Sequence, residues 1–289
     1  MKSIPFKSIF YKTAVLLVVV VPFIATLFAI RALWMRAIYW PDLALMAVVY
    51  FPTGFGVTVG FHRMASHRSF LPNPVVKFVL LALGCMPLQG NPIEWAATHL
   101  KHHAVSDREG DPHSPLEGFW HAHFGWLFGV GVGTADPKVY CRHLLKDPIV
   151  VIVSRTFWFW VVLGLLIPFA IDGWRGLLWA GLVRIFLQQH ITWSVNSVCH
   201  CFGKRPFDTN DESRNEWLVG LLTLGDGWHN NHHAFPRSAY HGLRWWQIDL
   251  SNYLIWTLEH LGLVRDVHRV TPEMIERRSS AKVHAIIQK

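Results

Sequence analysis

The sequence is poor in charged residues. Asp, Glu, Lys and Arg make up only 16% of the 289 residues, whereas hydrophobic residues make up 52% and include 15 Trp and 19 Phe. Soluble domains carry roughly 25% charged residues, so this composition excludes an ordinary soluble domain. Aromatic side chains concentrate where membrane proteins meet the membrane–water interface. The composition therefore predicts an integral membrane protein with interfacial aromatic residues.

The sequence also lacks the signatures of several other protein classes. No nucleic-acid-binding motif accompanies the net charge of +8, so we interpret the basic residues as a membrane-facing surface and expect no nucleic-acid partner. The four cysteines form no Cys-x-x-Cys pair and no disulfide framework, which favours reduced thiols in an intracellular setting. Repeats, low-complexity tracts and flexible linkers are missing from the sequence, so we treat residues 1–289 as one domain.

Long apolar runs, in contrast, are present. A helix needs about 20 residues to cross about 30 Å of hydrocarbon. The first run is too long for a signal peptide and has no clear small-residue cleavage site, so we expect it to be retained. A further stretch, 74–90, is shorter, contains Lys77 and is closed by prolines, and its hydropathy is ambiguous. The four long runs form two hairpins and lie at about 13–33, 41–61, 149–171 and 176–198.

The distribution of Lys and Arg predicts the orientation. If 74–90 does not span, the two hairpin tips carry only Arg31, Arg36 and Arg175, and most of the 27 Lys and Arg residues lie on the other side. By the positive-inside rule that basic side is cytoplasmic. We therefore predict an all-α protein with four transmembrane helices, cytoplasmic N- and C-termini, and a cytosolic helical cap. The cap would consist of 62–148 and 199–289.

Half of the 18 histidines fall into four short groups. Positions i, i+3 and i+4 share one face of an α-helix, so "HLKHH" and "HNNHH" would each present three imidazoles to a common point, and His200 shares a face with Asn196. His62 and His67 would diverge by roughly 140° on a regular helix, so for both to bind, the helix must end or unwind between them. The groups are His62 and His67; His99, His102 and His103; His200; and His229, His232 and His233.

Four such groups together predict a metal site, although each alone is weak evidence. Nine imidazoles exceed the four or so ligands that zinc prefers and suit two ions with four or five nitrogen ligands each. Imidazole suits Zn, Cu, Fe and Ni, so ligand type does not identify the metal. All groups can share ions only from one side of the membrane, which requires 74–90 to be interfacial or re-entrant. Two metals beside saturated chains suggest hydrocarbon oxidation by dioxygen, and no His-Glu-x-x-His hydrolase motif is present.

Four segments resemble, in combination and order, the membrane fatty acyl-CoA desaturase family, the stearoyl-CoA (Δ9) type in particular. They read "GFHRMASHRSF", "EWAATHLKHHAVSDREGDPHSPLEGFWHAHFGWLF", "ITWSVNSVCHCFGKRPFD" and "GDGWHNNHHAFPRSAYHGLRWWQIDLSNYLIWTLEHLGL", and the resemblance covers about 50–265. It implies a four-helix membrane stem and a cytosolic cap with a di-iron centre, whose ligands would be the nine histidines. It also implies that Asn196 reaches an iron through water, that Trp193 lines the acyl tunnel and that Asp226 contacts ligand histidines.

Several other residues carry expectations of their own. His113 and His123 match family positions outside the ligand set, where hydrogen bonding to a ligand and plain packing are equally expected. Arg184 lies within the fourth run, where we expect an internal ion pair rather than a contact with substrate. We expect surface or packing roles for the remaining histidines: His121, His143, His190, His241, His260, His268 and His284.

The resemblance implies an activity. We expect O2-dependent removal of two hydrogens from adjacent methylenes of a saturated acyl chain, which gives a cis double bond. The resemblance implies CoA as the acyl carrier and Δ9 as the position of the double bond. A lipid hydroxylase is the alternative enzyme, but its usual first spacing is His-x-x-x-His, one residue shorter than here. A zinc-binding membrane receptor or transporter is an alternative of another class, with polar spans and fewer ligands. The residues by themselves leave four properties open: double-bond position, chain length, acyl carrier and oligomeric state.

The source of electrons is a further expectation. Reducing O2 to two waters takes four electrons and the C–H bonds supply two, so two must come from outside. The chain has no G-x-G-x-x-G fingerprint, no HPGG haem motif and no cysteine set for an iron–sulfur cluster. We therefore expect a separate ferredoxin or cytochrome b5-like carrier with its reductase. Basic residues near the histidine groups would steer an acidic carrier: Lys101, Arg108, Lys204 and Arg205.

Overall fold

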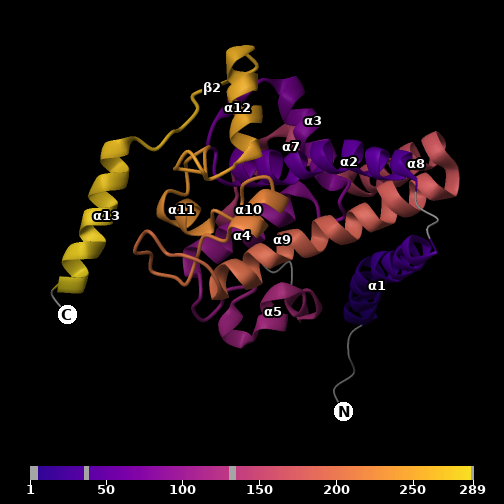
Figure 1. Ribbon diagram of the computed structural model, residues 1–289, viewed down its shortest axis with the longest axis horizontal. Helices are drawn as coiled ribbons and strands as arrows, with labels where there is room; N and C mark the ends of the chain where they lie inside the picture. The colour runs from indigo at the N-terminus through magenta and orange to yellow at the C-terminus, as the bar shows by residue number, and fades with distance from the viewer. Residues whose placement is uncertain (1–5, 36–38, 130–134, 288–289) are drawn as a thin grey trace.

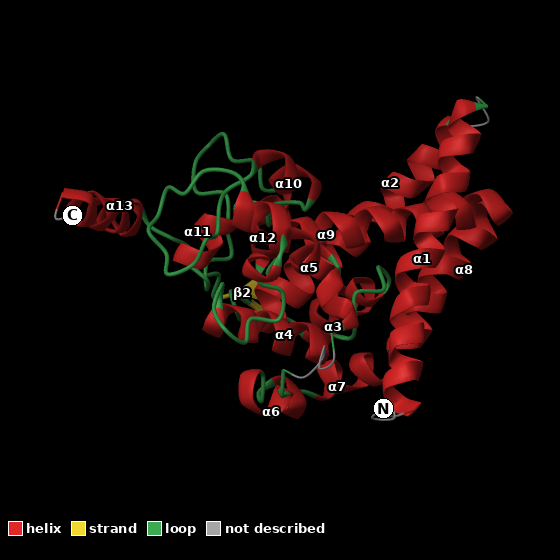
Figure 2. Ribbon diagram, turned by 90° about the horizontal axis from the view of Figure 1, so that it is seen from below, coloured by secondary structure: helices red, strands yellow, loops and turns green. Residues whose placement is uncertain are grey.

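The computed structural model describes residues 6–35, 39–129 and 135–287, and these are predominantly helical (Figure 1). Long helices gather at one end, and a cap of shorter helices and loops forms the other (Figure 2). Within the described residues, strands are limited to one antiparallel pair, β1 (Leu71–Pro72) with β2 (Val264–Arg265). Arg36 and the side chain of His284 lie outside the described residues.

The long helices form the stem. In the described part of the chain, three helical segments are long and apolar enough to cross a membrane, namely Lys12–Trp34, Trp40–Ser66 and Phe157–Cys201, whereas the sequence predicted four. The first two match the predicted runs 13–33 and 41–61. The third contains most of the last two predicted runs. The stem elements are α1 (Phe6–Trp34), α2 (Trp40–Phe55) with its π-helical continuation η1 (Gly56–Ser66), α8 (Phe157–Gly176), η5 (Leu177–Val183) and α9 (Arg184–Cys201).

The segment from α8 to α9 reverses direction at Asp172 and Gly173, whose backbone angles are not helical. Gly173 has φ +54°, in the region that favours glycine. After the turn, Gly176 lies so close to α8 that a Cβ atom there would sit 2.0 Å from the carbonyl oxygen of Pro168. The two halves therefore pack as a helical hairpin at the position where the sequence placed one.

The prediction of one helix over 149–171 is wrong. α7 (Pro148–Arg155) ends before Thr156, and α8 begins directly after it. The Thr156 hydroxyl donates to the carbonyl of Ile152 at 2.8 Å, and a hydroxyl bound to the preceding turn competes with regular helix geometry. At the other end, the Asp147 carboxylate caps α7 by accepting from the amide of Ile149 at 3.0 Å.

The ambiguous stretch 74–90 contains α3 (Pro74–Cys85), which is too short to span. Its 12 residues extend about 18 Å at 1.5 Å per residue, against about 30 Å of hydrocarbon. α3 packs tightly on η1, because a Cβ atom on Gly56 would lie 2.2 Å from the amide nitrogen of Gly84. Lys77 pairs with Asp147 at 2.6 Å and thereby ties α3 to α7. This geometry agrees with an interfacial or re-entrant segment.

Arg184 is fully buried in the stem, and no described residue forms the ion pair with it that we expected. Its guanidinium donates to the carbonyl oxygens of Met86, Gly164 and Ala180 at 3.0–3.1 Å and to Oε1 of Gln188 at 3.3 Å. These acceptors are all neutral. The prediction fails because four oxygens from three elements satisfy the N–H groups, so the buried cation acts as a hydrogen-bonded junction between helices.

The cap surrounds the end of η1. Its main hydrophobic core includes Val59 and Phe61 of η1, Leu81 of α3 and Ile255 of α12. α13 stands apart at the far end of the cap from the stem (Figures 1 and 2). The cap elements are α4 (Pro92–Val105), η2 (Pro115–Glu117), α5 (Phe119–His123), η3 (Gly125–Phe128), α6 (Pro137–Tyr140), η4 (Leu144–Lys146), α10 (Trp217–Leu222), α11 (His229–Ala234), α12 (Leu250–His260) and α13 (Pro272–Ile287).

Candidate metal centre

The helix that carries His62 and His67 changes from α to π form before it reaches them. η1 runs from Gly56 to Ser66, and the amide of His67 donates to the carbonyl of His62 at 3.1 Å, which is the i to i+5 pattern of a π-helix. A spacing of five then brings the two rings together in an edge-to-face contact, with centroids 5.0 Å apart. The predicted departure from a regular helix is confirmed.

The "HLKHH" segment lies on α4, which begins with Asn91 as its cap. The Asn91 side chain accepts hydrogen bonds from the amides of Ile93 and Glu94, both at 3.1 Å. Neighbouring residues on an α-helix point about 100° apart. His102 and His103 therefore face different directions, and the same holds for His232 and His233 on α11.

The nine predicted histidines form two groups at the junction of stem and cap. In each group, one ring nitrogen from every member lies within 4.8 Å of the others. The prediction that each His-x-x-His-His segment serves one common point is wrong, because both segments divide their histidines between the groups. The five-histidine group consists of His62, His67, His99, His103 and His232, and the four-histidine group consists of His102, His200, His229 and His233.

Ring nitrogens face one another within both groups. Nε2 of His232 lies 3.1 Å from Nε2 of His62 and 2.9 Å from Nε2 of His103, and the Nε2 atoms of His67 and His99 are 2.6 Å apart. One Nε2 atom offers either an N–H or a lone pair, so the Nε2 of His232 cannot hydrogen-bond to both of its neighbours at once, whereas one cation could accept all of these lone pairs. This donor set fits a transition metal that accepts imidazole nitrogen.

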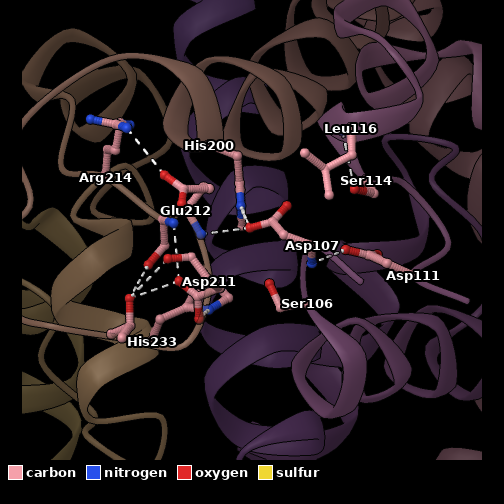
Figure 3. Close-up of polar contacts among 12 residues, drawn as sticks. Ser106, Asp107, Asp111, Ser114, Leu116, His200, Asp211, Glu212, Arg214 and His233 are labelled. Carbon is pink, nitrogen blue, oxygen red and sulfur yellow. Dashed lines mark hydrogen bonds and ion pairs between the residues drawn. The ribbon is translucent and has the colours of Figure 1, made fainter. Parts of the chain in front are cut away.

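Three aspartates, of which Asp111 is buried and the other two are partly buried, contact the four-histidine group. Nδ1 of His200 lies 2.8 Å from Asp107, and Nδ1 of His233 lies 2.8 Å from Asp211 (Figure 3). Nδ1 of His102 lies 3.0 Å from Asp111. A carboxylate can only accept here, so each Nδ1 carries the proton and each Nε2 keeps its lone pair for a metal.

The electrostatics keep the groups ready for a cation. Burial, reinforced by neighbouring histidines, lowers the pKa values of His67, His99 and His232 well below the ordinary range, so these rings are neutral. Burial alone would raise the pKa values of Asp111 and Asp211, but hydrogen bonds from His102 and His233 outweigh it and lower both. Neutral imidazole and ionised carboxylate are the forms that metal binding requires.

Asp226 lies beside the five-histidine group, as predicted from the resemblance. Its carboxylate is 3.2 Å from Nδ1 of His62 and accepts from Thr58 at 2.7 Å. The same carboxylate also contacts the buried Arg63 at 3.3 Å and His241 at 3.2 Å. Asp226 therefore links a predicted ligand to a buried charge network.

The sequence reading missed several of these residues. Asp107 and Asp111 follow the α4 histidines within nine positions, and that proximity was a usable signal. Asp211 lies in a polar stretch that gave no signal. His241, expected at the surface or in packing, is buried with Arg63 Nε 3.3 Å from its Nε2, and Arg63 also pairs with the buried Asp249.

The remaining predicted residues lie around the groups in different ways. The ring of His113 is 4.4 Å from that of His102, so it packs against a predicted ligand. His123 instead contacts Ser197 at 2.9 Å and His190 at 3.0 Å, and its ring lies 6.2 Å from Trp193. Asn196 is partly buried on α9, one turn before His200.

A pocket adjoins the five-histidine group. The space between its lining residues, including its open side, is about 360 Å³. α9 contributes Ile191, Thr192 and Val195 to the lining, and Asp226 forms the end next to His62. Trp193, the predicted tunnel residue, packs on the α5 side instead.

We expect His232→Ala to lower the metal content. His232 Nε2 lies between two other ring nitrogens, so its removal should weaken binding at that position by more than the roughly 10–100-fold typical of losing an outer partner. Elemental analysis of the purified variant measures this. The control is His268→Ala, which removes an exposed ring that contacts Arg237. Equal metal in His232→Ala and wild type would contradict the assignment.

We expect acid to destabilise the metal-free protein. Because the folded pKa values of His67, His99 and His232 are lowered, the unfolded chain binds more protons below its histidine pKa of about 6.5. The free energy of unfolding should then fall as the pH drops from about 7 to 5, by up to about 1.4 kcal/mol per pH unit for each such histidine. Thermal unfolding in detergent after chelation measures it, and a constant midpoint would argue against neutral buried rings.

Comparison with known proteins identifies the family of the chain. The fatty acid desaturase family model matches residues 32–255. The chain is 42% identical to hex-5-enoyl-[acyl-carrier protein] acetylenase of Moorena producens (strain JHB), over 91% of this chain and 88% of the relative. It is 41% identical to acyl-CoA C20 Delta5-desaturase of Anemone leveillei (84% and 78%) and 41% identical to sn-1 stearoyl-lipid 9-desaturase of Anabaena variabilis (79% and 84%). The chain therefore belongs to the fatty acid desaturase family.

Proposed function

We propose that this desaturase introduces a cis double bond into a saturated fatty acyl chain with O2, using two iron ions bound by the two histidine groups. The supporting observation is the pair of nitrogen-rich groups, whose Nε2 atoms face one another at 2.6–3.1 Å. Iron, when bound, supplies the redox chemistry by which dioxygen breaks unactivated C–H bonds. The two groups also argue against the zinc receptor, for which we expected fewer ligands.

The chain's own residues bind and orient. The apolar side chains of Val57, Ile191 and Val195 line the pocket beside Asp226, and this lining suits an acyl chain whose reacting methylenes must stop near His62. Fixing one pair of methylenes is the main contribution that a binding pocket makes to such a reaction. Water-mediated contact of Asn196 with an iron is part of the proposal, whereas the pocket beside Asp226 takes the place of a tunnel lined by Trp193.

The acyl carrier is a separate question. The resemblance implied CoA and Δ9, but the printed names of the three relatives specify an acyl-carrier protein, CoA and a lipid, and double bonds at different positions. They favour desaturation over the hydroxylase alternative without choosing a carrier. An assay that offers stearoyl-CoA and a stearoyl phospholipid separately would identify the carrier.

We expect expression in a host without its own desaturase to produce new cis-monounsaturated chains. Gas chromatography with mass spectrometry of the lipids gives the double-bond position and the lipid class. His102→Ala should abolish the product because it removes a ring from the four-histidine group, whereas His268→Ala should retain it. A hydroxylated product in place of an alkene would reject the desaturase proposal for this chain.

We expect turnover to depend on a separate electron carrier. Two electrons per turnover must come from outside, so purified protein with substrate and air should yield no product until a ferredoxin or cytochrome b5-like protein and its reductase are added. The restored rate should fall as salt is raised, because charge steering is screened. Sustained turnover with NAD(P)H alone would contradict the need for a carrier. A rate independent of salt would remove only the steering.

We propose four crossings, with both termini and the cap in the cytoplasm. The hairpin turn at Asp172–Gly173 would then lie on the outer side, and Gly90, close after α3, would lie on the cytoplasmic side. A single cysteine at 173 should react with an impermeant maleimide in intact cells, and one at 90 should react only after permeabilisation. Outside labelling at 90 would separate the histidine groups across the membrane and reject this topology.

A further inference from the structure

One cap helix exposes apolar side chains beside the stem. In the six-residue α10, Trp217 is 65% exposed, Leu218 46%, Leu221 40% and Leu222 41%. Leaving four large apolar side chains in water on one short helix is unfavourable, and exposed clusters of this kind mark interaction surfaces.

The opposite face of α10 is firmly held, so this exposure is not an accident of a loose helix. Val219 packs with Val195 and Cys199 of α9. The Glu216 carboxylate caps the helix by accepting from the amide of Val219 at 2.7 Å. The Tyr50 hydroxyl of α2 donates to the carbonyl of Leu222 at 2.7 Å. α10 therefore has one fixed orientation against two membrane-spanning segments.

The contact with Tyr50 indicates how deep α10 lies. Tyr50 is ten residues after Trp40, where the second candidate span begins, and ten residues rise about 15 Å. That is about half of a hydrocarbon layer of about 30 Å. The C-terminal end of α10 therefore contacts the middle of this candidate span and not its end.

A second exposed segment lies near α10. Trp245 is 92% exposed, and Trp246 and Ile248 are also exposed, with Arg244 beside them. The carbonyl of Ile248 accepts from Nε1 of Trp228 at 2.8 Å, and Trp228 packs against Gly220 in the middle of α10. α10 and the start of α12 lie close together in both ribbon views (Figures 1 and 2). Tryptophan beside arginine is typical of the headgroup region.

The buried side of this surface is the pocket. Leu222, Thr223 and Leu224 line it from α10 and the following turn, and the end at Asp226 lies 3.2 Å from Nδ1 of His62. Of the four exposed side chains of α10, Leu222 also lines the pocket, so it lies between the exposed surface and the pocket. The sequence of α10, WLVGLL, has no cation for the phosphates of CoA or for an acidic carrier protein.

We propose that α10 and 244–248 insert into the cap-side leaflet and that an acyl chain esterified to a membrane lipid enters the pocket past α10. The inserted surface follows from geometry alone, whereas the identity of the entering chain as substrate rests on the proposed function. The proposal departs from the CoA carrier expected from the sequence.

Spin labels test the insertion without any assay of activity. A nitroxide on Leu221→Cys, in a Cys201→Ser background, is compared in nanodiscs with one on Asp208→Cys in an exposed loop. The other cysteines are buried. We expect the label at 221 to be several-fold more accessible to O2, and several-fold less accessible to a water-soluble nickel complex, than the label at 208. Equal nickel accessibility at both positions would overturn the insertion.

Photolabelling tests the route. Phosphatidylcholine with a mid-chain diazirine is irradiated in nanodiscs, and labelled peptides are mapped by mass spectrometry. We expect label on 217–224 and on 188–195, which forms the far wall of the pocket. Label on 217–224 alone would overturn the route. Labelling of both by a protein that fails to desaturate would reject the proposed function and leave the route standing.

A pocket-filling variant supplies the matched control. A Cβ atom on Gly54 would already lie 3.0 Å from Leu224 and 3.3 Å from Gln188, so Gly54→Leu should fill the pocket. We expect it to reduce label on 188–195 several-fold and to leave label on 217–224 unchanged. Ile191→Trp, which enlarges a different lining residue, should do the same. Undiminished label on 188–195 in both folded variants would contradict entry through this pocket.

Discussion

The fold depends on bringing nine imidazole rings from four distant segments together in a largely buried space. Burying polar rings is costly unless each nitrogen has a partner, and here the Nε2 atoms face one another at 2.6–3.1 Å. Carboxylates take up three of the Nδ1 protons, so the remaining lone pairs point inward. The local structure serves this arrangement: η1 widens to π form to align His62 with His67, and α4 and α11 each supply rings to both groups.

The two groups differ in charge. His102, His200 and His233 of the four-histidine group each contact their own aspartate. In the five-histidine group the described carboxylate is Asp226, which it shares with Arg63 and His241. A cation in the four-histidine group would be held by four nitrogens and balanced by three negative carboxylates. A cation in the five-histidine group would have a fifth nitrogen, but the negative charge of Asp226 there is already offset by Arg63. Two bound ions would therefore have different environments, even though all nine rings are chemically alike.

Features that depend on the spacing of residues along the chain could be predicted from the sequence. Features that depend on the direction in which a side chain points could not. Periodicity predicted the histidine segments and the break between His62 and His67, whereas the hydropathy of 74–90 was ambiguous and the Lys and Arg distribution favoured a segment that does not span. The division of each His-x-x-His-His segment between two groups could not be predicted, because the 100° between neighbouring residues decides it only once both partners are placed. The ion pair of Arg184 and the single helix over 149–171 were wrong predictions, because backbone carbonyls, which no sequence pattern reveals, accept from the guanidinium and from the Thr156 hydroxyl. His241 had no motif, and its role depends on Arg63 from another helix.

The position of α10 connects the membrane to the chemistry. The pocket lies where α2, α9 and α10 meet, and Asp226 closes it next to His62. If the histidine groups sat further into the cap, an acyl chain would have to leave the bilayer completely, with the loss of about 0.8 kcal/mol per exposed CH2. Because η1 continues α2, His62 lies twelve residues after Tyr50 on the same helical segment, and the pocket between them offers apolar contacts from Val57, Ile191 and Val195. The same extension makes Thr58 and Tyr50 walls of one pocket, one against Asp226 and the other against α10.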